Sequence, residues 1–351
     1  MRKNDAMPCQ IKIKLQPSGH AFAANENHTV LESAIDAGLT LPHGCCKGVC
    51  GACKGKILEG DADLGVCAEH ALPAAERENG YALLCRARPR SNLLIEINGV
   101  EEDASIRPKE FPCRVGRLEL LATDVMRVEL QPLAAEPFAF RAGQYIDILL
   151  EDGQRRSFSI ANAPSKTDVL ELHIRRIPGG RFTPQVFEGM KPEDVLRIDG
   201  PHGSFWLREK SGRPIVMLAG GTGFAPLKGL IEHAIHIGLA RPITLYWGAR
   251  TAEWLYQHEI AQSWQSALPR FRYIPVISDT RPDDGWTGRR GLVHEAVLAD
   301  FADLSRHEVY ACGAPPMIEA ARNSFTRTCG LPDDAFYSDA FTFSAMPEAK
   351  D

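Results

Sequence analysis

Four cysteines give the strongest chemical signal in the sequence. Cys45, Cys50 and Cys53 follow a C-x4-C-x2-C pattern, and Cys85 lies further along the chain. Thiolates at this spacing can ligate the two irons of a 2Fe-2S cluster. Structural zinc is the alternative, but zinc sites repeat the Cys-x2-Cys pair, and Cys85 has no second cysteine at that distance. The spacing therefore predicts a 2Fe-2S cluster.

The residues between these cysteines fit a loop wrapped around such a cluster. Gly44, Gly48 and Gly51 allow backbone N–H groups to turn toward the sulfurs, where hydrogen bonds help to set the reduction potential. Cys46 is off the ligand pattern, and we interpret it as a packing residue. His43 is interpreted as a loop residue, because four thiolates already fill the site.

A second group of residues has the chemistry that a flavin needs. Arg156 offers a bidentate charge for a phosphate, Phe158 a flat apolar surface and Ser159 a donor near the ring. Taken alone, this stretch could be a barrel strand with an exposed arginine and a core phenylalanine. The glycine turn at Gly180 leads into a helix start at Thr183, where backbone N–H groups and the hydroxyl could hold a pyrophosphate. The two stretches together predict FAD.

A third group of residues is typical of nucleotide binding. A glycine-rich turn follows a buried strand and begins a helix; it consists of Gly220, Gly221, Thr222 and Gly223. Pro226 stands where the Rossmann fingerprint has its third glycine, so that fingerprint does not match. A later strand ends in Cys312-Gly313 before another helix. Ligands bind at the carboxyl ends of such strands, so both turns should face one crevice. A buried packing thiol is the alternative for Cys312.

The type and order of the expected helices and strands that position these residues change along the chain. An alternating strand at residues 10–15 and a short helix with a Thr29-x-x-Glu32 capping box precede the cysteine loop. Short strands then follow near 113–121, 125–131, 143–150, 156–161, 169–175 and 195–199, which predicts a small antiparallel barrel. From residue 215 strands alternate with helices, with the helices expected at 224–237, 253–262, 292–299 and 315–328. This alternation predicts a parallel sheet covered by helices.

Length and composition are those of a multidomain globular protein. The 351 residues leave room for two or three cores at roughly 150 residues each. With 44% hydrophobic and 24% charged residues, the disordered, collagenous and coiled-coil classes are excluded. The net charge of −5 without a basic cluster argues against a nucleic-acid partner. We expect no membrane span and no secretory signal, and hence a cytoplasmic location.

Two resemblances follow from these motifs. The stretch from His43 to Cys53 resembles the cluster loop of plant-type ferredoxins. The flavin stretch, the glycine turn and Cys312-Gly313 resemble the motifs of the ferredoxin-NADP reductase superfamily. Together they resemble single-chain reductases, namely those of bacterial oxygenases and those acting on CDP-6-deoxy-3,4-glucoseen. The resemblance implies that Phe341 lies against the flavin where nicotinamide arrives, although it could instead be a core residue of the last strand.

The expected fold class is a multidomain α+β and α/β protein. It combines a ferredoxin-like β-grasp domain, an antiparallel β-barrel flavin domain and a parallel-sheet α/β nucleotide domain. The expected boundaries are an N-terminal tail (1–9), the 2Fe-2S domain (10–99), a polar linker (100–110), the FAD domain (111–210), the NAD domain (211–343) and a C-terminal tail (344–351).

The resemblance implies an enzyme that carries electrons from NADH to FAD, to the 2Fe-2S cluster and on to a protein acceptor. A flavin must stand between the other two cofactors, because NADH gives two electrons as hydride and the cluster accepts one at a time. We expect Cys312, Ser159 and Phe341 at the site of hydride transfer. An oxygenase and a sugar dehydrase fit equally well as acceptor, and NADPH is an alternative donor. A flavin reductase acting directly on a small molecule and a redox-sensing cluster protein remain alternatives.

Overall fold

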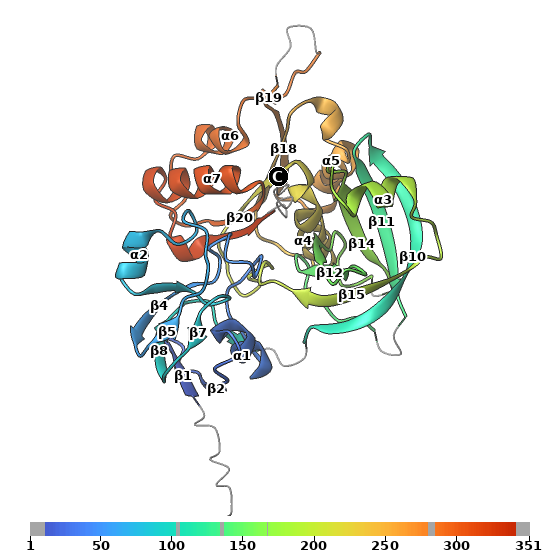
Figure 1. Cartoon of the computed structure of the whole chain (residues 1–351). Coiled ribbons are helices and arrows are strands. Elements are labelled where there is room, and N and C mark those ends of the chain that lie inside the picture. Colours follow the sequence, from blue (N-terminus) through green and yellow to red (C-terminus); the bar gives the residue numbers. More distant parts are fainter. Residues whose placement is uncertain (1–10, 103–105, 134–136, 167, 280–284, 342–351) are drawn as a thin grey trace, which may run out of the picture. The chain divides into compact units, whose positions relative to one another are not determined.

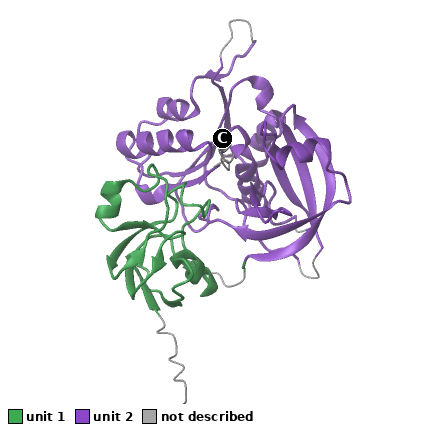
Figure 2. Cartoon of the chain, viewed as in Figure 1, with its two compact units in different colours: residues 1–107 green, residues 108–351 purple. Residues whose placement is uncertain are grey.

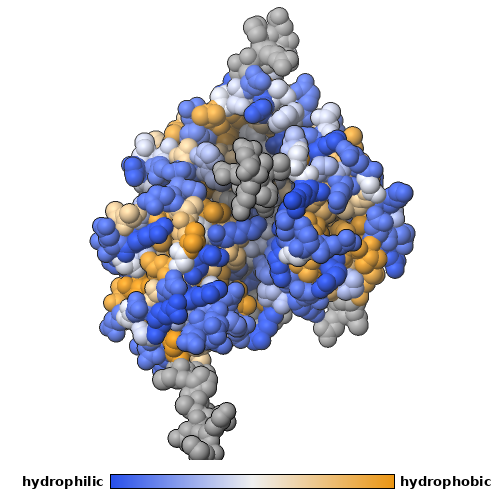
Figure 3. Space-filling view, viewed as in Figure 1, coloured by the Kyte–Doolittle hydropathy of each residue, from blue (hydrophilic) through white to orange (hydrophobic). Residues whose placement is uncertain are grey.

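The computed structural model describes residues 11–102, 106–133, 137–166, 168–279 and 285–341. The expected tails at 1–9 and 344–351 lie outside the described residues. The chain divides into two compact units, residues 1–107 and 108–351 (Figure 2). Among the described residues, no helix has both the length and the apolar character needed to cross a membrane. Figure 3 shows hydrophilic residues over most of the visible face, with apolar residues in smaller groups.

The first unit is built on a mixed five-stranded sheet in the order β2-β1-β8-β4-β6 (Figure 1). The strand β1 pairs antiparallel with β2 and parallel with β8, and its alternate residues Ile13 and Leu15 are fully buried. The elements of this unit are β1 (Ile11–Gln16), β2 (Ala21–Ala24), α1 (Val30–Asp36), β3 (Leu39–Thr40), β4 (Lys54–Glu59), β5 (Ala62–Asp63), α2 (Ala74–Glu78), β6 (Tyr81–Leu83), β7 (Arg88–Pro89), β8 (Leu93–Glu96) and β9 (Glu101–Glu102).

The helix α1 begins with the capping box that the sequence predicts. The backbone N–H of Glu32 donates to the Thr29 hydroxyl at 3.2 Å, and the backbone N–H of Thr29 donates to the Glu32 carboxylate at 2.7 Å. These bonds satisfy two of the donors that a helix start leaves unpaired. The helix ends before the cysteine loop, which has no regular secondary structure between β3 and β4.

The second unit begins with a six-stranded antiparallel barrel in the order β13-β12-β15-β10-β11-β14. A bridge between Ile160 and Leu172 links the two ends of this order and closes the barrel. The predicted barrel is confirmed, with strands close to the expected ranges. Its elements are β10 (Lys109–Ala122), β11 (Val125–Pro132), β12 (Tyr145–Leu149), β13 (Arg155–Ser159), β14 (Leu170–Arg175), α3 (Thr183–Glu188) and β15 (Val195–His202).

The same unit continues as a six-stranded parallel sheet in the order β19-β18-β17-β16-β20-β21. The elements are β16 (Ile215–Gly220), η1 (Gly221–Gly223), α4 (Phe224–His236), β17 (Ile243–Ala249), η2 (Ala252–Trp254), α5 (His258–Ala267), β18 (Phe271–Ile277), β19 (Arg289–Arg290), α6 (Val293–Asp300), β20 (Glu308–Gly313), α7 (Pro315–Thr328), η3 (Asp333–Ala335) and β21 (Phe336–Ala340). This sheet confirms the predicted parallel α/β class.

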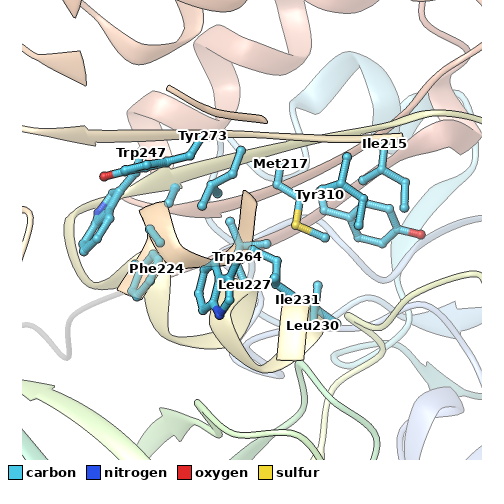
Figure 4. Packing of buried hydrophobic residues seen from close by; sticks show 14 of the residues in the cluster. Ile215, Met217, Phe224, Leu227, Leu230, Ile231, Trp247, Trp264, Tyr273 and Tyr310 are labelled. Atoms are coloured by element: carbon cyan, nitrogen blue, oxygen red, sulfur yellow. The ribbon is translucent and has the colours of Figure 1, made fainter. Parts of the chain in front are cut away.

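Both faces of the parallel sheet are covered by helices. Alternate residues of β16 enter two different cores: Met217 packs with α4 and α5, whereas Val216 packs with α6 and α7. The first of these cores contains a group of large aromatic side chains, including Phe224, Trp247 and Trp264 (Figure 4). Strand β16 is buried on both faces, as is typical of a parallel sheet covered by helices, and the glycine turn begins at its carboxyl end.

Three details differ from the expectations. The helix expected at 253–262 lies later in the chain: residues 252–254 form a short 3-10 turn, and α5 extends over His258–Ala267. A final strand, β21, pairs with β20; the sequence analysis considered a last strand only in the alternative for Phe341, which directly follows β21. The range expected for the polar linker, 100–110, contains strand residues near both ends: Glu101–Glu102 pair with β3, and β10 begins at Lys109.

Candidate functional site

The four cysteines of the predicted cluster lie as two pairs. The backbone N–H of Cys45 donates to the Cys50 sulfur at 3.4 Å, and that of Lys47 donates to the Cys45 sulfur at 3.4 Å. A hydrogen bond with the Cys50 thiol lowers the pKa of Cys45 to about 5 and raises the pKa of Cys50. In the other pair, the same kind of contact lowers the pKa of Cys85 and raises that of Cys53.

This arrangement fits a dinuclear centre. Among the described residues, no group of three or more His, Cys, Asp or Glu side chains gathers as a single metal ion would need. Two thiol pairs suit a 2Fe-2S cluster, in which each iron takes two protein ligands. Cys53 and Cys85 also join the apolar core of the first unit, so the second pair is buried. The four cysteines would hold the cluster.

The loop between the ligands differs from the expectation at one residue. Cys46 is exposed rather than packed, with a left-handed φ of 53°. His43 is buried, and its Nδ1 donates to the Leu41 carbonyl at 2.7 Å, as expected of a loop residue. Gly48 has a φ of 77°, and a Cβ there would lie 2.9 Å from the Arg86 side chain, so this position needs glycine for both reasons.

The residues predicted to hold the flavin lie on and beside strand β13. Arg156 donates to the Gln154 amide oxygen at 2.6 Å and to the Arg155 carbonyl at 3.0 Å. Phe158 is half-buried and its ring centroid lies 5.8 Å from that of Phe182. These contacts orient a guanidinium and an aromatic ring on one edge of the barrel.

The hydroxyl of Thr183 lies in the turn that contains Gly180. It accepts a hydrogen bond from the backbone N–H of Ile177 at 2.9 Å. A Cβ on Gly180 would lie 3.0 Å from the Ile177 carbonyl and 3.1 Å from this hydroxyl. The hydroxyl therefore closes the turn that leads into α3.

The predicted nucleotide residues meet at the carboxyl ends of adjacent strands. Strand β16 pairs with β20, and Ala219 lies opposite Cys312. The turn from Gly220 to Gly223 continues from β16, and a Cβ on Gly223 would lie 2.1 Å from the Cys312 carbonyl oxygen. Only glycine permits this close approach, which brings the glycine turn against Cys312.

A carboxylate that the sequence analysis did not single out completes this region. Asp339 lies opposite Cys312 in the pairing of β21 with β20, and it accepts a hydrogen bond from the Ser159 hydroxyl at 3.1 Å. Burial and the Asp339 charge raise the pKa of the Cys312 thiol, which is therefore neutral. Phe341 follows two residues later, and its backbone N–H donates to the Gly313 carbonyl at 2.8 Å. The structure thus places Ser159 and Cys312 beside Asp339, with Phe341 directly after the end of strand β21.

The chain matches three protein families in succession. Residues 13–90 match the 2Fe-2S iron-sulfur cluster binding domain, 112–206 the oxidoreductase FAD-binding domain and 217–323 the oxidoreductase NAD-binding domain. It is 39% identical to CDP-6-deoxy-L-threo-D-glycero-4-hexulose-3-dehydrase reductase of Yersinia pestis, over 94% of this chain and 98% of that protein. The chain belongs to the single-chain 2Fe-2S flavoprotein reductases.

Other members of this reductase family match over similar lengths. Terephthalate 1,2-dioxygenase reductase component 2 of a Comamonas species is 35% identical over 94% of this chain and 97% of that protein. The crystal structure of a cytochrome P450 reductase from Amycolatopsis has a TM-score of 0.77 and 32% identity, and the match covers 94% of this chain and 98% of that one. The protein is therefore an NAD(P)H-dependent oxidoreductase that uses FAD and a 2Fe-2S cluster in electron transfer.

A basic residue of the reductase's barrel reaches the glycine turn and was also missed by the sequence analysis. A Cβ on Gly221 would lie 3.2 Å from Nη1 of Arg175, the last residue of β14. The Arg175 guanidinium pairs with Asp124 at 2.8 Å and lies 4.4 Å from the Trp254 ring. The sequence signal for Arg175 is the alternation of apolar and polar residues in β14. That alternation does not tell which element the polar face of the strand contacts.

Proposed function

We propose that this reductase takes hydride from NADH where Ser159, Cys312 and Asp339 meet. The observation that carries the proposal is the hydrogen bond between Ser159 of the barrel and Asp339 of the parallel sheet, beside Cys312. When bound, FAD accepts two electrons as hydride and releases them singly to the 2Fe-2S cluster. Ser159 and Asp339 would hold a proton at the Ser159 hydroxyl, and the neutral, buried Cys312 would exclude water from the site.

Separate residues would anchor the two nucleotides. We assign Arg156 to the flavin phosphates, Phe158 to the flavin ring and the Gly180 turn to the pyrophosphate of FAD. Thr183 supports that turn through Ile177. The nicotinamide dinucleotide would lie on Gly220, Gly221, Thr222, Gly223 and Gly313, with Phe341 at the nicotinamide end. Arg175 is positioned to meet its phosphates, because its guanidinium lies beside the glycine turn.

We propose a protein that acts on a CDP-deoxyhexulose, a 3-dehydrase component, as the electron acceptor. Support comes from the 39% identity to the Yersinia reductase, compared with 35% to the dioxygenase component of the same coverage. The cluster bound by Cys45, Cys50, Cys53 and Cys85 would be the exit, since it carries electrons one at a time.

The test of the acceptor is a reconstituted assay with two partners. The reductase and NADH are incubated with a CDP-hexulose dehydrase and its sugar, and separately with a dioxygenase component and its aromatic substrate. We expect NADH-dependent deoxysugar formation at a rate well above product formation by the dioxygenase. If product forms only with the dioxygenase, the proposed acceptor is wrong, but the function as a reductase stands.

The residue assignments have their own test. Ser159→Ala and Asp339→Asn should each slow anaerobic flavin reduction by NADH about 10²-fold, within the range for a positioned proton-transfer group. Ser157→Ala is the matched control, because the Ser157 hydroxyl on the same strand bonds Asp147 instead. Equal rates for Ser159→Ala and Ser157→Ala would show that Ser159 takes no part in hydride transfer.

A further inference from the structure

One face of strand β14 carries polar side chains that are in contact with the parallel-sheet half of the second unit. The alternate residues that face the barrel core are apolar and fully buried: Leu170, Leu172 and Ile174. The residues between them each contact a side chain beyond residue 211: Glu171 with Lys228, His173 with Tyr256, and Arg175 with Trp254. We call Glu171, His173 and Arg175 the β14 seam.

The central contacts form a continuous chain of hydrogen bonds. His173 Nε2 lies 2.8 Å from a Glu171 oxygen, and its Nδ1 lies 3.0 Å from the Tyr256 hydroxyl. Burial lowers the pKa of His173, so the ring is neutral and carries one proton. That proton must lie on Nε2, because the ionised Glu171 can only accept. Nδ1 then accepts from Tyr256, which fixes the direction of the tyrosine hydroxyl.

The other end of the chain is a buried ion pair. Lys228 on α4 is 3% exposed, and its ammonium contacts Glu171 at 3.1 Å and Glu232 at 2.7 Å. It also donates to the Ala161 carbonyl of the barrel at 3.1 Å. Removing one partner from such a pair leaves a charge without compensation, which is strongly unfavourable. The charges therefore hold α4 in one position against the barrel.

Tyr256 extends this chain of contacts to the glycine turn. Its ring lies edge-on to Trp247, with the centroids 5.1 Å apart at 86°. Trp247 stacks on Phe224 at 3.8 Å, and its Nε1 donates to the Gly221 carbonyl at 3.0 Å. Figure 4 shows Trp247 and Phe224 at the same end of this core. Each step from β14 to Gly221 is thus a direct contact.

We propose that the β14 seam is a positioning device that sets how closely the nucleotide approaches the flavin. The seam joins the barrel, which would hold FAD, to Tyr256, Trp247 and the glycine turn, which would hold the dinucleotide. The inference rests on the proposed hydride transfer. A displacement of about 1 Å between reacting groups can cost about 10²-fold in rate, so loss of a single contact in the seam should be measurable.

The test is Tyr256→Phe, which removes the hydroxyl and keeps the ring edge-on to Trp247 and Phe224. The matched control is Tyr273→Phe. The Tyr273 hydroxyl bonds His258 at 3.1 Å, and both residues lie in the parallel-sheet half, so this tyrosine–histidine contact does not join the two halves. Stopped-flow reduction of the bound flavin gives a limiting rate and an NADH dissociation constant for each variant.

We expect Tyr256→Phe to lower the limiting rate about tenfold while the dissociation constant changes less than twofold. Tyr273→Phe should match the wild type in both. His173→Gln should lower the rate similarly, and the double variant with Tyr256→Phe should be no slower than the slower single variant, because both remove the same contact. Additive losses would overturn the proposed link between the two residues.

A second measurement needs no NADH. Hydrogen exchange in the nucleotide-free protein should become faster at residues 221–224 in Tyr256→Phe and stay unchanged in Tyr273→Phe. An unchanged limiting rate in Tyr256→Phe would overturn the seam as a positioning device, even if exchange or thermal stability changed. A wild-type protein whose flavin NADH does not reduce would overturn the proposed function instead.

Discussion

Replacing Gly223 by alanine should slow flavin reduction by NADH without loss of the iron or the FAD. The φ of Gly223 is −58°, which suits any residue, so backbone strain plays no part. A Cβ would lie 2.1 Å from the Cys312 carbonyl oxygen and 2.8 Å from the Gly313 nitrogen, where real Cβ atoms keep at least 3.0 Å. The obstructing atoms are backbone in a buried strand, so the glycine turn itself must move, by about 1 Å. A displacement of that size at a reacting centre can cost about 10²-fold.

The measurement is anaerobic flavin reduction by NADH, together with iron and FAD content. Gly223→Ala should reduce its flavin about 10²-fold more slowly than the wild type and keep full iron and FAD. Gly212→Ala is the control, since a Cβ there meets nothing within 4 Å. A Gly223→Ala protein with wild-type reduction kinetics would refute the idea that the approach of this turn to Cys312 positions the nucleotide.

Three further outcomes follow from the same contacts. Cys85→Ser should lose the cluster and keep NADH-driven flavin reduction, whereas Cys46→Ser should keep both; loss of flavin reduction in Cys85→Ser would show that the units depend on each other. Residues 108–351 alone should fold, bind FAD rather than FMN and reduce ferricyanide with NADH, but reduce cytochrome c poorly; rapid reduction of cytochrome c would show that the cluster is not the exit. The pKa of Glu171 is about 2, because its bonds to His173 and Lys228 outweigh burial. The ionised Glu171 therefore stabilises the folded protein above pH ~4.5, and this contribution is lost as the pH falls toward 2. Between these two pH values, the free energy of unfolding should fall more steeply in the wild type than in Glu171→Gln. All five tryptophans lie in residues 108–351, so their fluorescence follows this unit alone.

The sequence predicted those parts of the site that depend on local spacing. The cysteine pattern and the glycine turns each lie within a few residues, and their chemistry can be deduced without knowing what lies opposite. Asp339 could not be found in this way, because its partner Ser159 is 180 residues earlier and belongs to another sheet. A single carboxylate in a strand near the end of the chain has no sequence pattern around it that would indicate a functional role.

Two other features show the same limit. The alternation in β14 identifies a strand with one polar face, but solvent and a neighbouring domain are equally consistent with that pattern. The helix expected at 253–262 begins instead at His258, after a short 3-10 turn at Ala252–Trp254. The structure places Trp254 beside Arg175 and Tyr256 beside His173, so contacts with the barrel decide where α5 begins.

The central claim is that electrons pass from NADH through the flavin to the cluster held by the four cysteines. Anaerobic titration of the purified protein, containing about two irons and one FAD per chain, with NADH tests this most directly. Absorbance follows the flavin, and electron paramagnetic resonance follows the cluster. The flavin should bleach and the signal of a reduced 2Fe-2S cluster should appear, whereas Cys85→Ser should show bleaching alone. A bleached flavin with a cluster that stays oxidised in the wild type would contradict the claim.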